Sequence, residues 1–410
     1  MSNLSRRQKR EKKKKQAKKV EIEVQRLERQ AEVKKQAEQI VQQKAVNAQQ
    51  QMNGTNKKSP IVINYIADRN GCGYYRSIWP AELLATYRNI MTVNTFLYDQ
   101  TNFHKVDVYR FQRQATREQR MAWDNYLSVR RQHGYGFRMQ YEIDDLLMEI
   151  EPHNKIAYDY FDKEKKEHHL HMLRTADSIM FSTEPLKKAY VEDYGIDPNK
   201  IRVVKNYLPQ FIYHLPYRHS VKSFDKTTKE GKPRIFWSGS ASHLGKGGDL
   251  EFLLPMIEKT VDEYTWVFQG VIPQELKGYV QEKKIEFYPW TPTYGLAVSQ
   301  FYKAKPDICL APLRPSRFNS MKSDLKYLEG CALGAPCITT SFEGTGFKSP
   351  YDDAGAEICI EPDADVWKTM IDYLIENPEY YLETLKKQYE FLNGRWMESN
   401  LHYWQDGILG

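Results

Sequence analysis

The chain has 410 residues, of which 41% are hydrophobic, and carries a formal net charge of +7. This length accommodates two domains and a tail, and no apolar run approaches the about 18 residues that a membrane-spanning helix needs. A signal peptide and Cys-x-x-Cys pairs are not recognised, so we expect a cytoplasmic protein without a membrane span, whose thiols are mostly buried. The cysteines are Cys72, Cys309, Cys331, Cys337 and Cys359.

The positive charge is concentrated at the beginning of the chain. Residues 1–58 contain 17 Lys or Arg and 6 Asp or Glu, a balance of +11, whereas the remainder contains 43 and 47, a balance of −4. Val20, Val24, Leu27 and Ala31 are spaced like the seam of a helix that packs on another helix. We expect a partly helical or disordered arm, which either binds a polyanion such as nucleic acid or is a solubilising or self-associating tail.

The composition changes at Pro60, where strands and helices begin to alternate. Ile61 to Ile66 is typical of a buried strand, and Gly71 and Gly73 follow it ahead of a helix. A strand, a glycine loop and a helix open a Rossmann-like domain, whose loop lies at the carboxyl edge of the sheet. The glycines let a ligand approach the backbone closely, unless they form only an ordinary strand–helix turn.

A later strand of this domain, expected at 137–143, ends on two adjacent carboxylates, Asp144 and Asp145. At a strand end such a pair could orient an acceptor hydroxyl or act as a base. The plainer interpretation is a helix cap, because Asp is a favoured capping residue.

Two clusters contain residue types that bind metals but have a better structural interpretation. His168, His169 and His171 lack further ligands at a suitable spacing, so they are expected on a helix surface. Asp363 and Asp365 precede a helix, where capping is the better interpretation. The sequence therefore predicts no metal site.

The second half of the chain repeats the alternation. Arg234 to Gly239 is an expected strand, and Ser240 and His243 lie in the loop that follows it, before a helix at 250–257. A loop of small residues ahead of a helix start is a natural cradle for a diphosphate.

The most informative stretch is 318–340, a strand–helix transition followed by another strand. Its apolar residues recur at i, i+3 and i+7, the spacing of one buried helix face. Lys322 and Lys326 are expected in the first two helical turns, where lysines beside free N–H groups indicate an anion such as a phosphate. Glu329 shares the face of Lys326, and a carboxylate can accept hydrogen bonds from both hydroxyls of a ribose. A solvated Lys–Glu pair is the plainer interpretation.

This stretch resembles the donor-binding helix of GT-B glycosyltransferases, in particular the large retaining family 4, or group 1, that uses nucleotide sugars. The matching motifs are Lys326-Tyr-Leu-Glu329, Ala332-Leu-Gly-Ala-Pro336 and Gly344-Thr-Gly346. The loop from Gly71 to Arg76 and the string Tyr141 to Asp145 are similar to a subgroup common in phage and bacterial genomes. The family's first glutamate falls on Met321, where this sequence departs from the pattern.

The resemblance implies an α/β fold of the GT-B type, in which two Rossmann-like domains face a cleft. It implies an N-terminal acceptor domain at 59–213, a linker at 214–232 and a nucleotide-sugar domain at 233–375. The helices at 376–410 belong to a region that in this architecture often crosses back to the first domain.

The resemblance also implies roles for individual residues. Glu329 would hold the nucleotide ribose, and the sugar or phosphates would face Gly239, Ser240, His243, Lys322, Ser323, Lys326 and Gly344. Gly71, Gly73, Tyr75 and Arg76 would face the cleft, and Asp144 and Asp145 would be the catalytic candidates. The donor would be a nucleoside diphosphate sugar, with no obligatory cofactor or metal.

The expected activity is sugar transfer to an acceptor hydroxyl with retention of configuration. One acceptor hypothesis is a hydroxymethylated pyrimidine in phage DNA, held through the basic arm in the host cytoplasm. The alternatives are a glycan, lipid-linked or protein acceptor, or an inactive GT-B shell that serves as a binding module, which Met321 keeps open. The sequence leaves the sugar, the nucleotide and the oligomeric state undetermined.

Overall fold

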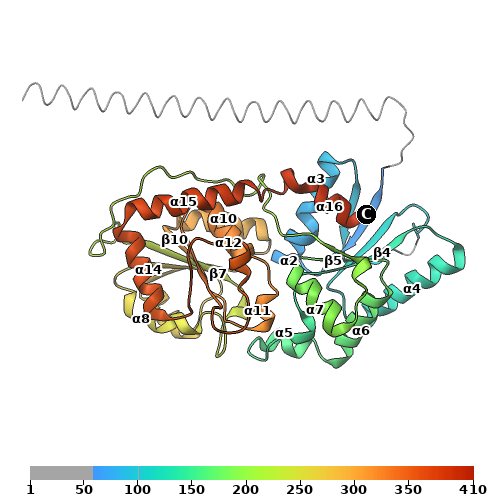
Figure 1. Ribbon diagram of the computed structural model, residues 1–410, viewed down its shortest axis with the longest axis horizontal. Coiled ribbons are helices and arrows are strands. Elements are labelled where there is room, and N and C mark those ends of the chain that lie inside the picture. Colours follow the sequence, from blue (N-terminus) through green and yellow to red (C-terminus); the bar gives the residue numbers. More distant parts are fainter. Residues whose placement is uncertain (1–58, 100) are drawn as a thin grey trace, which may run out of the picture. The chain divides into compact units, whose positions relative to one another are not determined.

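The computed structural model describes residues 59–99 and 101–410, so the arm expected at 1–58 lies outside the described residues. Two parallel sheets of six strands organise the described chain (Figure 1). We call the part built on the first sheet the N-domain and the part built on the second sheet the C-domain. This arrangement agrees with the expected α/β fold class.

The first sheet has the strand order β2-β1-β3-β4-β5-β6. Its strands are β1 (Ile61–Tyr65), β2 (Met91–Thr95), β3 (Val108–Gln112), β4 (Arg138–Ile143), β5 (Ser178–Phe181) and β6 (Ile201–Val203). The helices of this part are α2 (Gly71–Gly73), η1 (Tyr74–Ile78), α3 (Trp79–Tyr87), α4 (Arg117–His133), η2 (Leu147–Glu149), α5 (Lys155–Tyr160), α6 (Lys163–Thr175), α7 (Glu184–Tyr194) and η3 (Pro198–Lys200).

The second sheet has the order β12-β11-β10-β7-β8-β9. Its strands are β7 (Arg234–Gly239), β8 (Thr265–Gly270), β9 (Ile285–Pro289), β10 (Ile308–Ala311), β11 (Cys337–Thr340) and β12 (Cys359–Ile360). The helices are η4 (Ala241–His243), η5 (Glu251–Leu253), α8 (Leu254–Thr260), η6 (Gln274–Leu276), α9 (Lys277–Gln281), α10 (Tyr294–Ala304), α11 (Arg317–Ser320), α12 (Leu325–Ala332), α13 (Pro350–Asp353), α14 (Ala364–Glu376), α15 (Pro378–Asn393), η7 (Glu398–Asn400) and α16 (Leu401–Leu409).

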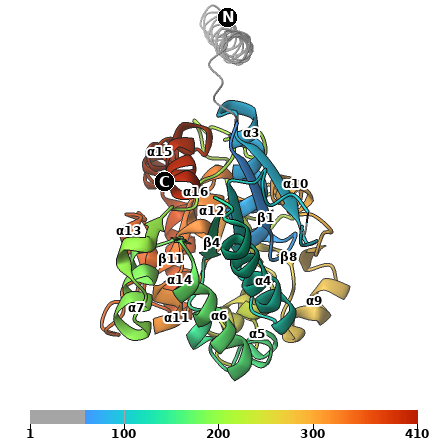
Figure 2. The same cartoon turned by 90° about the vertical axis from the view of Figure 1, so that its right-hand side faces the viewer.

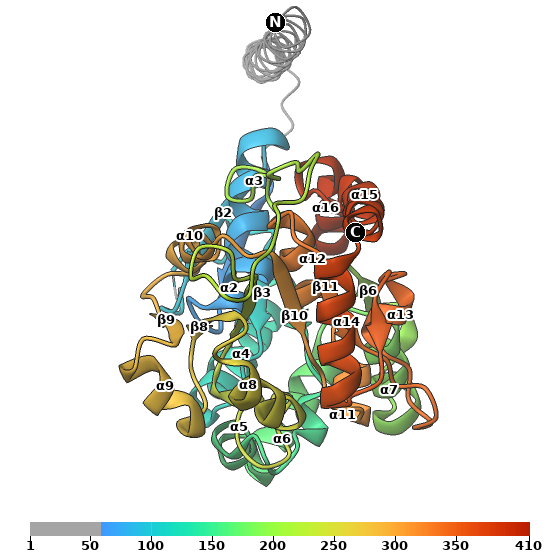
Figure 3. The same cartoon turned by 90° about the vertical axis from the view of Figure 1, so that its left-hand side faces the viewer.

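Alternating side chains of each strand serve two hydrophobic layers, as the period of a strand requires. In the N-domain, Ile63 and Tyr65 belong to the hydrophobic cluster that includes α4, α6 and α7, whereas Val62 belongs to the cluster that includes α3 and α16. Figure 2 shows these helices around the first sheet. In the C-domain, α8 and α14 cover one face of the sheet, and α10 and α12 cover the other (Figure 3). One hydrophobic cluster extends from α3 and α16 to α10 and α12, so the domains share part of their core.

The chain reverses its winding direction beside the first strand of each sheet. In the first sheet β1 lies between β2 and β3, and in the second β7 lies between β8 and β10. Ligands of open α/β sheets bind at such switch points, outside the carboxyl ends of the strands. The topology therefore directs attention to the loops that follow β1, β3, β7 and β10.

The last helix returns to the N-domain. Leu208, which follows β6, pairs with Trp396, which follows α15, and α16 packs on α3. At this crossing the guanidinium of Arg395 forms a two-pronged ion pair with Asp324 at 2.7 and 2.9 Å and donates to the carbonyl of Asn206. The crossing thus ties the start of α12 to the N-domain.

The metal-like clusters have structural roles. Asp363 caps α14 by accepting from two backbone N–H groups, which confirms the capping interpretation. His168, His169 and His171 lie on α6, but the first two face the core, so the expected surface position is wrong for them. Burial lowers the pKa of His169 to about 3, and this ring lies between the hydroxyls of Tyr141 and Tyr190.

The cysteines are free thiols. Three of them, Cys309, Cys331 and Cys337, are buried as expected, whereas Cys72 and Cys359 are partly exposed. Within 59–99 and 101–410, no helix combines the length and the apolar character needed to cross a bilayer.

A buried ion pair lies at the centre of the N-domain. Arg76 of η1 and Glu142 of β4 are both fully buried, with Nε 2.6 Å from Oε1. The guanidinium also donates to the carbonyl of Val204 and the side chain of Asn206, and it stacks on Trp404 of α16. The expected position of Arg76 in a cleft is therefore not found, because this side chain joins β4, β6 and the returning helix.

We predict that Arg76→Met lowers the free energy of unfolding by about 3–5 kcal/mol, because it leaves the Glu142 carboxylate buried beside a more distant cation. Arg130→Met is the matched control, since it removes an N-domain arginine from Asp177 in a pair that is 26% and 33% exposed. That change should cost no more than about 1 kcal/mol. Urea unfolding of both variants measures the difference, and equal losses would contradict the structural role of Arg76.

Candidate functional site

Segments that follow β5 and β6 of the N-domain meet the segment between α11 and α12 of the C-domain. The hydroxyl of Thr183 donates to the carbonyl of Met321, and the side-chain amide of Asn206 donates to the hydroxyl of Ser323 at 2.8 Å. The carboxyl edges of both sheets therefore contribute to one site, which we call the interdomain site.

Glu329 of α12 is the most densely bonded group of this site. Its Oε1 accepts hydrogen bonds from Tyr75 at 2.7 Å, from Tyr213 at 3.3 Å and from Tyr294. Its Oε2 accepts from Nζ of Lys326 at 2.9 Å. Glu329 is only 3% exposed, so the interpretation as a solvated Lys–Glu pair is wrong.

The three tyrosines come from different parts of the chain: η1, the segment after β6, and α10. Burial raises the pKa of Tyr75, Tyr213 and Tyr294, and the nearby Glu329 charge raises each further. The hydroxyls therefore stay protonated and donate to the carboxylate. Glu329 thus joins both domains and the connection between them.

The two lysines differ in position. Lys326 lies in the first turn of α12 and also donates to the hydroxyl of Ser238 at the end of β7, at 3.2 Å. Lys322 lies between α11 and α12, with Nζ 5.2 Å from the ring centre of Phe318. The expectation that Lys322 stands in a helical turn is wrong, because α12 begins only at Leu325.

His243 is held by a buried carboxylate. Its Nδ1 lies 2.6 Å from Oδ2 of Asp249, which is 2% exposed. Burial lowers the pKa of His243, the bond to Asp249 opposes this shift, and the charge of Lys322 adds to it. Burial acts to raise the pKa of Asp249, but the bond and charge of His243, the charge of Lys322 and the backbone N–H of Arg314 together lower it.

The loop after β7 needs its first glycine. A Cβ on Gly239 would come within 2.5 Å of the Trp237 ring and 3.1 Å of the His243 ring. Ser240 pairs with Ser242 through their hydroxyls at 2.6 Å. The predicted residues Gly239, Ser240 and His243 are thus brought together at the end of β7.

Asp144 and Asp145 follow β4 and share one cation. Nη1 of Arg113, which follows β3, lies 3.2 Å from both carboxylates. Arg113 has a φ of 51°, a left-handed conformation that is uncommon for a non-glycine residue and often marks a functional site. Its guanidinium also contacts the thiol of Cys72 in α2 at 2.9 Å. The two aspartates thus act as an ion-pair cluster and not as a helix cap.

Charged groups from both domains influence the pKa of Asp145. Burial and Asp144 raise its pKa, whereas Arg113 and the C-domain groups Lys322 and His243 lower it. The carboxylate therefore lies within electrostatic reach of the groups expected to bind phosphate.

The glycine segment after β1 is helical, contrary to the expected loop, and α2 continues directly into η1. A Cβ on Gly73 would lie 1.9 Å from the carbonyl oxygen of Asp68, so this close approach requires glycine. A Cβ on Gly71 would touch the ring of Tyr294 at 3.4 Å. Gly344, with a φ of 74°, lies in the exposed loop after β11.

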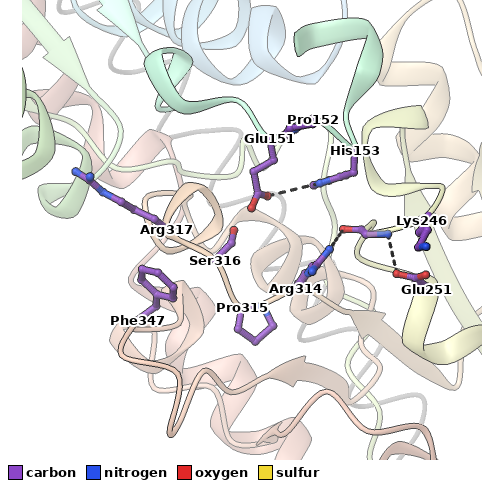
Figure 4. A pocket seen from close by; sticks show the side chains of 11 residues that line it. Glu151, Pro152, His153, Lys246, Glu251, Arg314, Pro315, Ser316, Arg317 and Phe347 are labelled. Carbon is purple, nitrogen blue, oxygen red and sulfur yellow. Dashed lines mark hydrogen bonds and ion pairs between the residues drawn. The ribbon is translucent and has the colours of Figure 1, made fainter.

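A pocket of about 570 Å³ lies beside the loop of His243 and is lined by both domains (Figure 4). Glu151, Pro152 and His153 line it from the N-domain, and Lys246, Gly247, Glu251, Arg314, Pro315, Ser316, Arg317 and Phe347 line it from the C-domain. Arg314 donates to the carbonyl of Gly247 at 3.0 Å (Figure 4). Arg317 instead forms an ion pair with Glu149 and Asp193 of the N-domain.

Tyr75 was among the residues expected in the cleft, whereas sequence patterns did not identify three other groups of this site: Arg113, Tyr213 and Tyr294. Arg113 follows a strand at a switch point, a signal that needs the strand order. The tyrosines come together only in three dimensions. In the part of the chain that the structure describes, no group of three or more His, Cys, Asp or Glu residues could hold a metal ion.

No protein-family model matches this chain, and no curated protein matches it by sequence. Among solved structures, HepE of Anabaena in complex with UDP-glucose is similar, with a TM-score of 0.56 and 10% identity over 84% of this chain and 97% of that chain. A glycosyltransferase from Rickettsia africae has a TM-score of 0.53 and 15% identity over 85% of this chain and 97% of that chain. These likenesses show that the chain has the GT-B fold, as predicted.

The ion-pair cluster of Arg113, Asp144 and Asp145 should make the stability of the protein depend on pH. Because the pKa of Asp145 is raised in the folded state, the folded state binds more protons, and stability falls as pH rises from about 4. Arg113→Gln removes the main cation that opposes this shift. We predict a loss of about 2–3 kcal/mol at pH 7.5 and a smaller loss at pH 4.5.

Urea unfolding at both pH values measures this difference. Arg120→Gln is the control, because Arg120 pairs with Asp124 on the exposed face of α4, where a pair is worth at most about 1 kcal/mol. A loss in Arg113→Gln that is equal at pH 4.5 and 7.5 would show that the cation does not govern Asp145.

Proposed function

We propose that this GT-B protein transfers a sugar from a nucleoside diphosphate sugar to an acceptor hydroxyl. The observation that carries the proposal is the group of cations and histidine at the switch point of the C-domain, within electrostatic reach of the acidic pair that follows β4 in the N-domain. HepE, which has the same fold, is described in complex with UDP-glucose and in complex with UDP and glucose. A uridine diphosphate sugar is therefore the first donor to test.

The diphosphate is assigned to Lys322, Lys326 and His243. Two lysines and an imidazole offset the charge of the leaving group, and Ser240 and Ser323 place hydroxyls beside them. Stabilising the negative charge that develops on the leaving group is the main electrostatic task of such a site. Because protein cations supply this compensation, we propose transfer without an obligatory divalent metal.

The ribose is assigned to Glu329, which must then exchange partners. Both of its oxygens accept hydrogen bonds from protein groups. A ribose hydroxyl can take the place of a tyrosine hydroxyl on Oε1 at little net cost, because one donor replaces another. Tyr294 is the best candidate to yield, since its helix α10 contributes it from the C-domain surface beside Gly71.

The acceptor is assigned to the N-domain edge, beside Asp144 and Asp145. A carboxylate there can orient a hydroxyl or accept its proton, and the raised pKa of Asp145 makes it a stronger proton acceptor than an unperturbed aspartate. Gly71, Gly73 and the exposed loop of Gly344 complete the proposed walls of the site. Retention of configuration is part of the proposal and rests on the family resemblance.

For the acceptor of this reaction we propose DNA, which one observation favours. The arm at 1–58 has a balance of +11, whereas the rest of the chain has −4. An acidic body needs a cationic tether to stay on a polyanion. A hydroxymethylated pyrimidine in phage DNA satisfies this requirement. With a glycan, lipid-linked or protein acceptor, or if the protein is an inactive binding module, the basic arm would need another role.

We propose to test a panel of nucleoside diphosphate sugars, beginning with UDP-glucose. We expect the protein to transfer the sugar of one of these donors to an acceptor, or to hydrolyse that donor slowly. Product formation is followed by mass spectrometry with hydroxymethylated DNA, glycans and water as acceptors, in buffer with EDTA. We expect activity to survive EDTA, because lysines compensate the diphosphate. Activity that vanishes in EDTA and returns with manganese would contradict the metal-independent part, and no reaction with any donor would contradict the function.

If Glu329 binds the ribose, two substitutions should have opposite effects on nucleotide affinity. Glu329→Ala should abolish measurable nucleotide binding, and it should also destabilise the protein because it leaves buried donors unpaired. Tyr294→Phe should also cost stability, about 1–2 kcal/mol, but it should tighten nucleotide binding about threefold to tenfold, because a competitor for Oε1 is removed.

Calorimetric titration with UDP, and urea unfolding of the same samples, separate these effects. Tyr75→Phe serves as a comparison, because it removes a donor from the N-domain side of the same carboxylate. Weaker binding in both Tyr294→Phe and Glu329→Ala would show that Glu329 is a structural group and not a ribose ligand.

The arm predicts the salt dependence of DNA binding. Deleting residues 1–58 should raise the apparent KM for long DNA at low salt and flatten the dependence of binding on salt. Turnover on a short acceptor should change little, because the interdomain site is built from later residues. Equal affinities and equal salt slopes of the full chain and the truncation would remove the main support for a DNA acceptor.

A further inference from the structure

One nitrogen of His243 is fixed by a buried network, and the other is available. Nδ1 is bonded to Oδ2 of Asp249 at 2.6 Å. Among the residues that the structure describes, Nε2 of His243 makes no hydrogen bond. An ionised carboxylate can only accept, so the proton of a neutral imidazole lies on Nδ1 and the lone pair lies on Nε2.

Asp249 is itself held by two further segments. Its Oδ1 accepts from the backbone N–H of Arg314 at 2.7 Å and from the side-chain amide of Asn319 at 2.9 Å. Asn319 also donates to the carbonyl of Arg314 at 2.9 Å. The loop after β7, the loop after β10 and α11 therefore converge on one carboxylate, which fixes the direction of the imidazole.

The ring of His243 has no freedom to turn away. It packs edge to face on Trp237, with ring centres 6.2 Å apart, and against Gly239, where even a Cβ would come within 3.1 Å of the ring. Its side chain is 17% exposed. Such a ring can respond to a ligand by a change of protonation more readily than by a change of position.

The charges around His243 keep it neutral without a ligand. Burial lowers its pKa, and Lys322 and Lys326 act in the same direction, whereas Asp249 opposes them. From the N-domain the charged group within electrostatic reach is Asp145. A bound diphosphate would add negative charge beside Lys322 and Lys326. This charge would raise the pKa of His243 and favour its protonated form.

We propose that His243 is a proton-coupled ligand of the diphosphate, with Asp249 and Asn319 as its positioning residues. This inference rests on the proposed function and adds a proton to it. When the diphosphate binds, Nε2 takes up one proton from solvent and donates the new N–H to a phosphate oxygen, and the imidazolium is stabilised through Nδ1–H by Asp249. When the diphosphate leaves, the proton returns to solvent.

The direction of the pH dependence follows from this coupling. The complex holds one more proton than the free partners, so affinity falls as pH rises from 7.5 to 8.5. The measurement stays above pH 7.5 because a terminal phosphate has its own ionisation at about pH 6. In this range the nucleotide is fully ionised and contributes no proton change.

The test is calorimetric titration of the full-length protein with UDP at pH 7.5 in buffers of different ionisation enthalpy, whose slope gives the protons taken up. ADP, GDP, TDP and inorganic pyrophosphate are titrated in parallel. We expect wild type to take up between half a proton and one proton. His243→Gln should take up none, and Asp249→Asn should lose most of the uptake and bind about tenfold more weakly.

A second His–Asp pair supplies the matched control. Nε2 of His171 lies 2.6 Å from Oδ1 of Asp124 on the α4–α6 surface, and Asp124→Asn should leave both uptake and affinity unchanged. If one of the nucleoside diphosphates binds without proton uptake, or with equal uptake in His243→Gln, the inference is overturned while the proposed function stands. If neither a nucleotide nor pyrophosphate binds, both are overturned.

Discussion

The buried carboxylate of Glu329 is the constraint on which the arrangement of the two domains depends. Its bonds to Tyr75, Tyr213 and Tyr294 tie the N-domain, the connecting segment and the C-domain to one atom. A charge at 3% exposure is tolerated only because hydrogen bonds and Lys326 compensate it. The same compensation makes the site responsive, since a ligand hydroxyl can replace a tyrosine hydroxyl without leaving the charge unpaired.

The electrostatics of the site follow from the placement of opposite charges on the two facing edges. The C-domain edge offers Lys322, Lys326 and His243, and the N-domain edge offers Asp144 and Asp145, which Arg113 holds together. Separation of this kind suits a reaction in which one substrate carries a diphosphate and the other gives up a proton. The carboxyl edges of the two sheets bring these groups together although they are far apart in the sequence.

The sequence was sufficient to predict the GT-B fold, because strand periodicity and the motif around Lys326 and Glu329 are local signals. It also placed the loop after β7 correctly. It could not show that Arg76 is buried with Glu142, since a glycine-rich loop with an arginine has the same pattern in either case. Tyr213, Tyr294 and the strained Arg113 were missed, because their proximity depends on strand order and on the packing of three segments.

The central claim is that the interdomain site binds a nucleoside diphosphate sugar through the groups of the C-domain switch point. Hydrogen–deuterium exchange of the full-length protein with and without UDP-glucose tests it most directly. We expect slower exchange in three segments, 66–76, 239–249 and 318–329, while α4 and α6 remain unchanged. Protection confined to other parts of the chain, or no protection at a saturating donor concentration, would contradict it.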